Sequence, residues 1–208
     1  MQDASSIKVW DISVRVFHWA LVAFFAIAYI TGEIETETLH AWAGYVIIGL
    51  LAYRLVWGLV GTKYARFSDF IYSPAEIMAY LKSLLSTHPK HYLGHNPAGG
   101  VMVVLLILGL TAVSWTGLKA YEAEGKGPLA AAPAITLSIP VAQADDDWNG
   151  HGGYGEKDEF WEEAHEAAVY FMLLLIALHL GGVAVSSLLH RENLARAMVT
   201  GRKKLPKE

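Results

Sequence analysis

Four long apolar stretches constrain the fold of this chain more than any other feature. They cover about residues 14–31, 39–60, 98–117 and 163–189, and each approaches or exceeds the roughly 20 residues that an α-helix needs to cross a bilayer core. Only 17% of the residues are charged and 54% are hydrophobic, which is too apolar for an ordinary soluble domain. We therefore predict an all-α integral membrane protein, a four-helix bundle within residues 1–193.

Basic residues are distributed unevenly along the chain. Most of its 16 lysines and arginines lie near the start of the first apolar stretch, around the end of the second, in the loop that follows, or after the fourth. The exceptions are Lys119, Lys126 and Lys157. The positive-inside rule then places both termini and the second loop in the cytoplasm. The two opposite loops are acidic, with Glu33, Glu35 and Glu37 in the first and Asp145, Asp146 and Asp147 in the third.

The connections between the stretches differ in character. The second loop holds an amphipathic segment from Pro74 to Leu85 with Ser73 as its expected cap, which predicts a short helix on the membrane surface. Asn96-Pro97 is typical of the cap and first turn of a helix, here the third span. The third loop, residues 118–160, is long and acidic, which predicts a mobile segment or one ordered by a partner. Residues 194–208 are expected to form a basic cytoplasmic tail.

Four histidines fall at two depths of the predicted bundle. His165 and His179 are fourteen residues apart in the fourth stretch, a spacing that returns a helix to within roughly 40° of the same face and climbs about 21 Å. His18 lies just inside the cytoplasmic end of the first stretch, at the depth of His179. His40 opens the second at the outer surface, as His165 opens the fourth. Pairing His18 with His40 would require one metal, with bonds of about 2 Å, to bridge most of the bilayer.

This pattern predicts two bis-histidine haem sites, His18 with His179 and His40 with His165. The chain has no cysteine, which excludes thiolate-bound metal, covalently attached haem and thiolate iron–sulfur clusters. A single histidine at a helix end is more often an interfacial polar residue than a ligand, so the depth-matched pairing carries the prediction. The remaining histidines are expected to be solvated. They are His88, His91, His95, His151 and His190.

Three motifs, together with the histidine spacing of the fourth stretch, resemble one known family. The motifs are VWDISVRVFHW (Val9 to Trp19), LHAWAGYVIIGLLAYRLVWGLVG (Leu39 to Gly61) and YLGHNPAGG (Tyr92 to Gly100). They resemble the prokaryotic cytochrome b561 family, which includes the cytochrome b subunits of membrane-bound nickel-iron hydrogenases. The resemblance covers the chain from Val9 to about Asn193. It implies a four-helix bundle in the bacterial inner membrane with two haem b groups, held by the same two pairs of histidines.

Two arginines are further candidates for cofactor binding. Arg15 lies one turn before His18, and Arg54 lies near the cytoplasmic end of the second stretch. Both are placed to bind the propionates of the inner haem. The alternative is that they extend to the lipid headgroups and determine only the topology.

Two axial histidines leave iron without an open coordination position, which favours outer-sphere electron transfer over oxygen chemistry. We therefore expect a relay between a periplasmic redox protein, such as a c-type cytochrome, and the quinone pool, with no nucleic-acid partner. A homodimer and a subunit of a larger complex both stay open. The acidic outer face favours a partner with a basic docking face.

Two other functions are weighed against the relay. A superoxide oxidase would pass electrons from superoxide to quinone, but the outer carboxylates would repel that anion. A non-haem proton or metal transporter would be expected to carry carboxylates deep within its spans. Here the acids of the fourth stretch lie at its outer end, at Glu162, Glu163 and Glu166.

Overall fold

The computed structural model describes residues 6–84, 90–130 and 155–204. Within these ranges, four helices are long and apolar enough to cross a membrane. They are α1 (Ile12–Glu33), α2 (Glu37–Val60), α4 (Pro97–Ala123) and α6 (Gly155–Leu189), of which Glu159–Leu189 forms the candidate span. The predicted all-α membrane bundle is confirmed.

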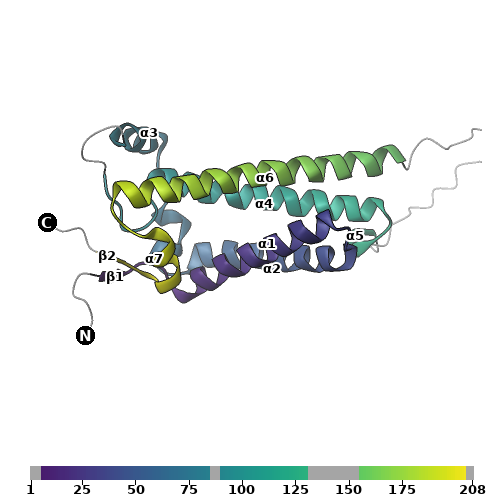
Figure 1. The fold of residues 1–208 in the computed structure, drawn as a ribbon, viewed down its shortest axis with the longest axis horizontal. Helices are drawn as coiled ribbons and strands as arrows, with labels where there is room; N and C mark the ends of the chain where they lie inside the picture. The colour runs from purple at the N-terminus through teal and green to yellow at the C-terminus, as the bar shows by residue number, and fades with distance from the viewer. Residues whose placement is uncertain (1–5, 85–89, 131–154, 205–208) are drawn as a thin grey trace, which may run out of the picture.

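The four spans form two antiparallel pairs (Figure 1). Helix α1 packs along α2, and α4 packs along α6, while the main contact between the pairs runs between α2 and α4. Among the described residues, helix α6 has no extensive close backbone contact with α1 or α2 and meets them mainly through side chains. The side of α6 that faces the α1–α2 pair is therefore separated from it by side chains rather than by close backbone contact.

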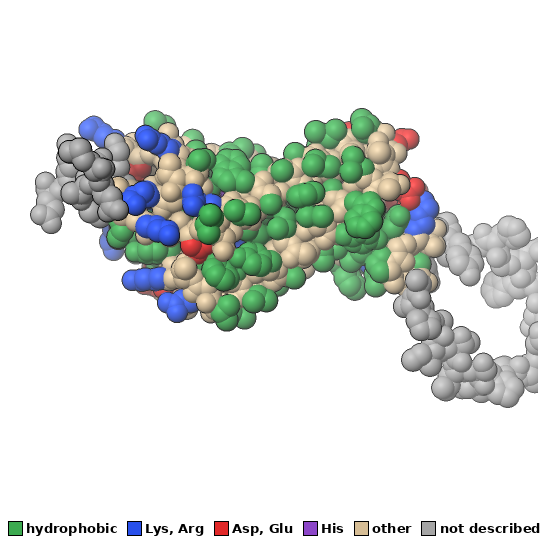
Figure 2. Space-filling model, turned by 90° about the horizontal axis from the view of Figure 1, so that it is seen from below, with side chains coloured by type: hydrophobic (Ala, Val, Ile, Leu, Met, Phe, Trp, Pro, Cys, Tyr) green, Lys and Arg blue, Asp and Glu red, His purple; other side chains and the backbone are tan. Residues whose placement is uncertain are grey.

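The surface divides into three zones along the bundle axis. Hydrophobic side chains cover the middle, and lysines and arginines gather at the end where the termini lie (Figure 2). We call this the basic end, and it carries Arg15, Arg54, Arg66 and Arg202. The opposite, acidic end carries the turn from Glu33 to Glu37 and the corner after α4. There Lys126 Nζ lies 2.7 Å from Glu37 Oε1 and 2.9 Å from Glu124 Oε2, which links that corner to the start of α2.

An apolar core lies between the two ends and joins the helix pairs. Its buried residues are Ile47, Leu51, Leu110, Met172 and Leu175, and Leu21, Phe24, Phe25 and Ala28 of α1 pack against them. Met172 and Leu175 lie between His165 and His179 along α6. The two levels of histidines are therefore separated by a packed hydrophobic layer.

The two ends of the chain close over the basic end in a unit that we call the terminal clasp, residues 6–10 and 194–204. Strand β1 (Ser6–Lys8) pairs antiparallel with β2 (Arg202–Lys204), and Gly201 O accepts hydrogen bonds from the N–H groups of Val9 and Trp10. Helix α7 (Leu194–Thr200) supplies Ala197 to a small core with Trp10. The segment expected to form a basic cytoplasmic tail, 194–208, thus contains a helix and a strand as far as Lys204, held in place by strand pairing and burial.

The remaining elements agree with most of the expected connections. After two short 3₁₀ turns, η1 (Lys63–Ala65) and η2 (Phe67–Asp69), helix α3 (Pro74–Ser83) begins with the predicted Ser73 cap, which forms a capping box with Glu76. Asn96 Oδ1 accepts from Gly99 N at 2.7 Å and caps α4 as predicted. Helix α4 ends at Ala123, α5 covers Gly127–Ala130 and α6 begins at Gly155. Both ends of the expected third loop are therefore helical, and Asp145, Asp146 and Asp147 lie outside the described residues.

Candidate functional site

His40 and His165 meet at the acidic end of the bundle. Their ring centroids are 6.0 Å apart and their planes are nearly perpendicular, at 88°. His40 Nδ1 lies 2.8 Å from the carbonyl oxygen of Ala28 on α1, and His165 Nδ1 lies 3.1 Å from that of Val113 on α4. Because a carbonyl only accepts, each Nδ1 must carry the proton and donate it, which leaves both Nε2 lone pairs free to bind a metal.

The two imidazoles are supported in the same way by repeated sequence on two helices. Ala28, Thr31 and Gly32 on α1 correspond to Val113, Thr116 and Gly117 on α4. A Cβ on Gly32 would lie 3.2 Å from His40 Nδ1, and one on Gly117 would lie 2.9 Å from His165 Cε1. Glycine is therefore what lets each ring approach its supporting helix.

The threonines complete each support. Thr31 Oγ1 donates to Ile27 O at 2.7 Å and contacts Ala28 O, while Thr116 Oγ1 lies 3.1 Å from Val113 O and 3.2 Å from His165 Nδ1. Sequence reasoning missed these residues. The signal was the Thr-Gly pair that recurs at the acidic ends of the first and third spans.

His18 and His179 lie at the basic end and are close enough for their charges to interact. Unlike the acidic-end pair, this pair includes a buried imidazole nitrogen, His18 Nδ1, without a hydrogen-bond partner. The ring of His18 packs edge-on against Trp19, with centroids 5.1 Å apart. The structure thus brings the predicted histidines together in depth-matched pairs at opposite ends, and it fixes the acidic-end pair more tightly.

The two predicted arginines lie at the basic end with different surroundings. Arg15 Nη1 donates to Val199 O in the terminal clasp at 2.5 Å, while its Nε is buried without a partner. Arg54 is only 4% exposed, and its Nη1 is likewise buried and unpartnered. Arg54 therefore does not extend to the headgroup region, and its position favours a role inside the protein.

The other histidines do not all behave as expected. His95 was expected to be solvated, and this is wrong: its ring lies between Trp10 and Phe70, with centroids 4.6 Å from each. Burial and the nearby charge of Arg54 lower the pKa of His95 to about 3. His91 Nε2 lies 2.8 Å from Glu192 Oε1 at the protein surface. His88 and His151 lie outside the described residues.

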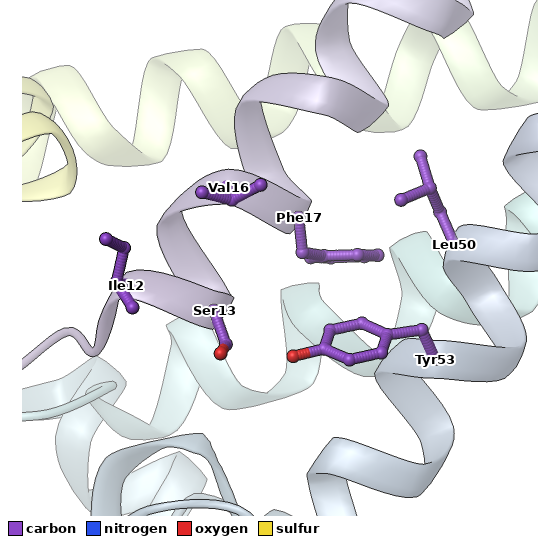
Figure 3. Close-up of a pocket in the computed structure, with 6 residues that line it drawn as sticks. All are labelled: Ile12, Ser13, Val16, Phe17, Leu50 and Tyr53. Carbon is purple, nitrogen blue, oxygen red and sulfur yellow. The ribbon is translucent and has the colours of Figure 1, made fainter.

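A pocket of about 360 Å³ opens between α1 and α2 in the half of the bundle near the basic end (Figure 3). It is lined by Ile12, Ser13, Val16, Phe17, Leu50 and Tyr53. The hydroxyls of Ser13 and Tyr53 lie on the same side of it (Figure 3). Phe17 directly precedes His18 on α1, so this pocket lies at the depth of the basic-end pair.

Comparison with known proteins gives a consistent result. The family described as prokaryotic cytochrome b561 matches residues 9–201. A probable Ni/Fe-hydrogenase B-type cytochrome subunit of Azotobacter chroococcum is 25% identical over 97% of this chain and 90% of its own length. One from Rhodobacter capsulatus is 23% identical over 95% of this chain and 81% of its own length. No solved structure matches.

A compact site for a bare metal ion would need several ligands in one place. Among the described residues, no group of three or more His, Asp or Glu side chains is arranged to hold a metal ion. The paired histidines are instead the arrangement that a haem iron uses. The chain belongs to the prokaryotic cytochrome b561 family and is a membrane b-type cytochrome that transfers electrons.

Proposed function

We propose that this chain is a two-haem relay that carries electrons between a redox protein at the acidic end and the membrane quinone pool. The observation that carries the proposal is the acidic-end pair, in which two nearly perpendicular imidazoles lie close together and each uses Nδ1, not Nε2, in its hydrogen bond. When two imidazoles bind one metal from opposite sides, the distance between their ring centres is two metal–nitrogen bonds of about 2 Å plus the distance from each nitrogen to the centre of its ring. The total is roughly 6 Å. The 6.0 Å between His40 and His165 fits this value.

The surroundings of the histidines also fit a flat, wide cofactor. Gly44 follows His40 by one turn, and Gly182 follows His179 by one turn, so each lies on the face of its ligand. A Cβ at either glycine would meet no atom within 4 Å. Each histidine pair joins α6 to α1 or α2. These helices meet mainly through side chains and without extensive close backbone contact.

The roles of the residues follow from these positions. His40 with His165, and His18 with His179, would be the axial ligands of two haem b groups. When bound, haem b supplies a one-electron carrier at each level, and two axial histidines leave the iron no position for a substrate. The carbonyls of Ala28 and Val113 orient the acidic-end imidazoles, and the apolar core excludes water between the two levels. Arg54, and Arg15 through its free Nε, would bind propionates at the basic end.

The charge distribution supports one orientation in the bacterial inner membrane. Arginines and lysines gather at the end that holds the termini (Figure 2), which by the positive-inside rule is the cytoplasmic end. The acidic end would then face the periplasm. We therefore call the His18–His179 site the inner site and the His40–His165 site the outer site.

The relatives indicate what class of protein the periplasmic partner belongs to. Their names describe them as cytochrome subunits of Ni/Fe hydrogenases, which favours a place for this chain in a larger complex with an electron-donating enzyme or a c-type cytochrome. Exposed carboxylates such as Glu33 and Glu37 favour a partner with a basic face. Electron exchange with that partner should slow steeply as salt is added. The same carboxylates disfavour superoxide as the substrate.

The pocket beside Phe17 supports quinone as the partner within the membrane. Its volume is within the range of small-ligand sites, and its lining is apolar except for Ser13 and Tyr53. Neither hydroxyl is hydrogen-bonded to another described residue, so both are free to donate to quinone oxygens. Tyr53→Phe should slow reduction of the inner haem by a quinol, with haem content unchanged.

Haem counting tests the relay. The purified protein should contain two haem b per chain in a pyridine haemochrome assay. His18→Ala and His165→Ala should each contain one, whereas His91→Ala, a change at a surface histidine, should contain two. A colourless protein, or one haem in the wild type, would contradict the proposal.

A further inference from the structure

All of the buried side-chain nitrogen and oxygen atoms that lack a hydrogen-bond partner in the described residues lie at the basic end. They are Arg15 Nε, His18 Nδ1, Arg54 Nη1 and His95 Nδ1. Burying a polar group without a partner costs free energy, and burying an unpaired charge costs considerably more. This end of the bundle is therefore arranged around a polar group that the protein itself does not supply.

Arg54 is the strongest indication of what that group is. Its guanidinium lies over Phe67, with Cζ 4.9 Å from the ring centroid, and Gly58 gives that ring the room to pack there. None of the ion pairs among the described residues includes Arg54. Asp11 acts on it only at longer range, because its carboxylate accepts from Val14 N, Trp57 Nε1 and Thr62 Oγ1. A buried guanidinium in these surroundings calls for an anion.

His95 brings a second donor to the same place. Its ring is held between Trp10 and Phe70, its carbonyl oxygen accepts from Tyr72 Oη at 3.0 Å, and the next residue, Asn96, caps α4. The ring is therefore held by two aromatic contacts, and the backbone beside it is held by the Tyr72 hydrogen bond and the Asn96 cap. A neutral imidazole offers one N–H donor, and the buried Nδ1 has no partner within the protein.

Both side chains lie near the same ring, that of Phe70. Phe70 is fully buried, with His95 packed 4.6 Å from its ring centroid and Arg54 Cζ 5.8 Å from it. The charge of His179, a proposed inner-site ligand, also reaches His95. Arg54 and His95 thus lie together beside the inner site.

We propose that Arg54 and His95 jointly bind one propionate carboxylate of the haem held by His18 and His179. This rests on the proposed two-haem function, adds a residue, His95, and gives a partner to the unpaired nitrogens of Arg54 and His95. A guanidinium binds a carboxylate through two parallel N–H groups, and the imidazole N–H provides a third donor. A propionate is covalently part of the haem, so it enters the buried site together with the cofactor, unlike a free anion.

Infrared difference spectroscopy on the complete protein tests the pair directly. Haem labelled isotopically in its propionate carboxylates reports their hydrogen bonding as the inner haem is reduced. We expect the labelled bands to shift in Arg54→Gln and in His95→Gln. They should stay unchanged in Arg66→Gln, which removes an exposed arginine from the same end of the protein.

The midpoint potential of the inner haem gives a second readout. Removing a buried positive charge disfavours the reduced state, so this potential should fall in Arg54→Gln and fall less in His95→Gln, while that of the outer haem stays constant. If Arg54→Gln does not fold, Arg54→Lys keeps the charge but loses the paired N–H groups, and its propionate bands should still shift.

The outcomes separate this pair from the two-haem function. Two haems with unshifted bands in the Arg54 and His95 variants would overturn the pair and leave the relay intact. A wild type with fewer than two haems would overturn the relay itself.

Discussion

The two ends of the bundle hold their histidines in contrasting ways. At the outer site, both imidazoles donate Nδ1–H to a backbone carbonyl of a neighbouring helix, and a glycine on that helix gives each ring its room. At the inner site, His18 Nδ1 has no partner, and buried nitrogens of Arg54 and His95 are also unpaired. The outer imidazoles are therefore positioned by the protein alone, whereas the inner site would be completed by the haem that we propose to bind there.

The contrast extends to charge. Buried Arg54 and the nearby basic residues surround the inner site, while exposed carboxylates such as Glu33 and Glu37 surround the outer one. Positive charge favours the reduced form of a nearby redox group, and negative charge disfavours it. We therefore expect the proposed inner haem to be the more readily reduced of the two, which would favour electron flow from the acidic end towards the basic end.

The largest effect is expected at Gly117, where the outer site depends on a close approach. In Gly117→Val, a Cβ would lie 2.9 Å from the ring of His165, and the imidazole would be displaced from its position opposite His40. Haem content should fall from two per chain to one, with the inner haem retained. Gly49→Val is the matched control, because a Cβ at that exposed position meets no atom within 4 Å. Two haems in Gly117→Val would show that this support is dispensable.

The next effect is at the terminal clasp, which packs on His95 through Trp10. Trp10 is 6% exposed and packs on the ring of His95. Trp10→Ala should lower the free energy of unfolding by about 3–5 kcal/mol. During unfolding in mixed micelles, the absorption of each haem can be followed separately, and the inner haem should be released first. Trp115→Ala, at a 54% exposed position, should have little effect. Equal stability of the two variants would contradict the role of the clasp.

In the protein freed of haem, where no propionate faces His95, lowering the pH should weaken the basic end by a smaller amount. The pKa of His95 is lowered from 6.5 to about 3 in the folded protein, mainly by burial. The unfolded chain therefore binds a proton that the folded one does not, so the stability contributed above pH 6.5 is lost as the pH falls towards 3. Between pH 7 and pH 5 this loss amounts to about 2 kcal/mol. His95→Gln should flatten the profile, and an unchanged slope would argue against the buried position of this ring.

The smallest effect is expected at Thr116, which contributes one hydroxyl to the outer site. Thr116→Val removes the oxygen 3.2 Å from His165 Nδ1, a contact worth about 1 kcal/mol. Weaker hydrogen bonding makes the imidazole a poorer electron donor to iron, so the potential of the outer haem should rise slightly. Thr111→Val is the control, since Thr111 bonds only to Ile107 O in its own helix. A shift of equal size in both variants would remove Thr116 from the site.

The fold and the four candidate ligands followed from sequence because they depend on simple periodic quantities. Apolar length predicts spans, and the fourteen-residue spacing of His165 and His179 predicts two levels on one helix face. The Asn96 and Ser73 caps were recognisable for the same reason, since capping is a local interaction between residues three apart.

Residues whose roles depend on distant partners were not predictable in this way. From sequence alone, His95 looks like a solvated loop histidine. Its ring contacts Trp10 and Phe70, which are distant from it in the chain. The terminal clasp joins Ser6 to Lys204 across almost the whole sequence, and no local pattern indicates that pairing. Gly32 and Gly117 were visible as residues, but their function depends on which helix lies opposite.

Haem content of double histidine variants tests the central claim, that the ligands pair by depth, most directly. His40→Ala with His165→Ala should remove one haem and leave one, and so should His18→Ala with His179→Ala. The crossed variant, His18→Ala with His165→Ala, should bind none. A haem retained in the crossed variant, or both haems lost when one depth-matched pair is removed, would contradict the pairing and the relay built on it.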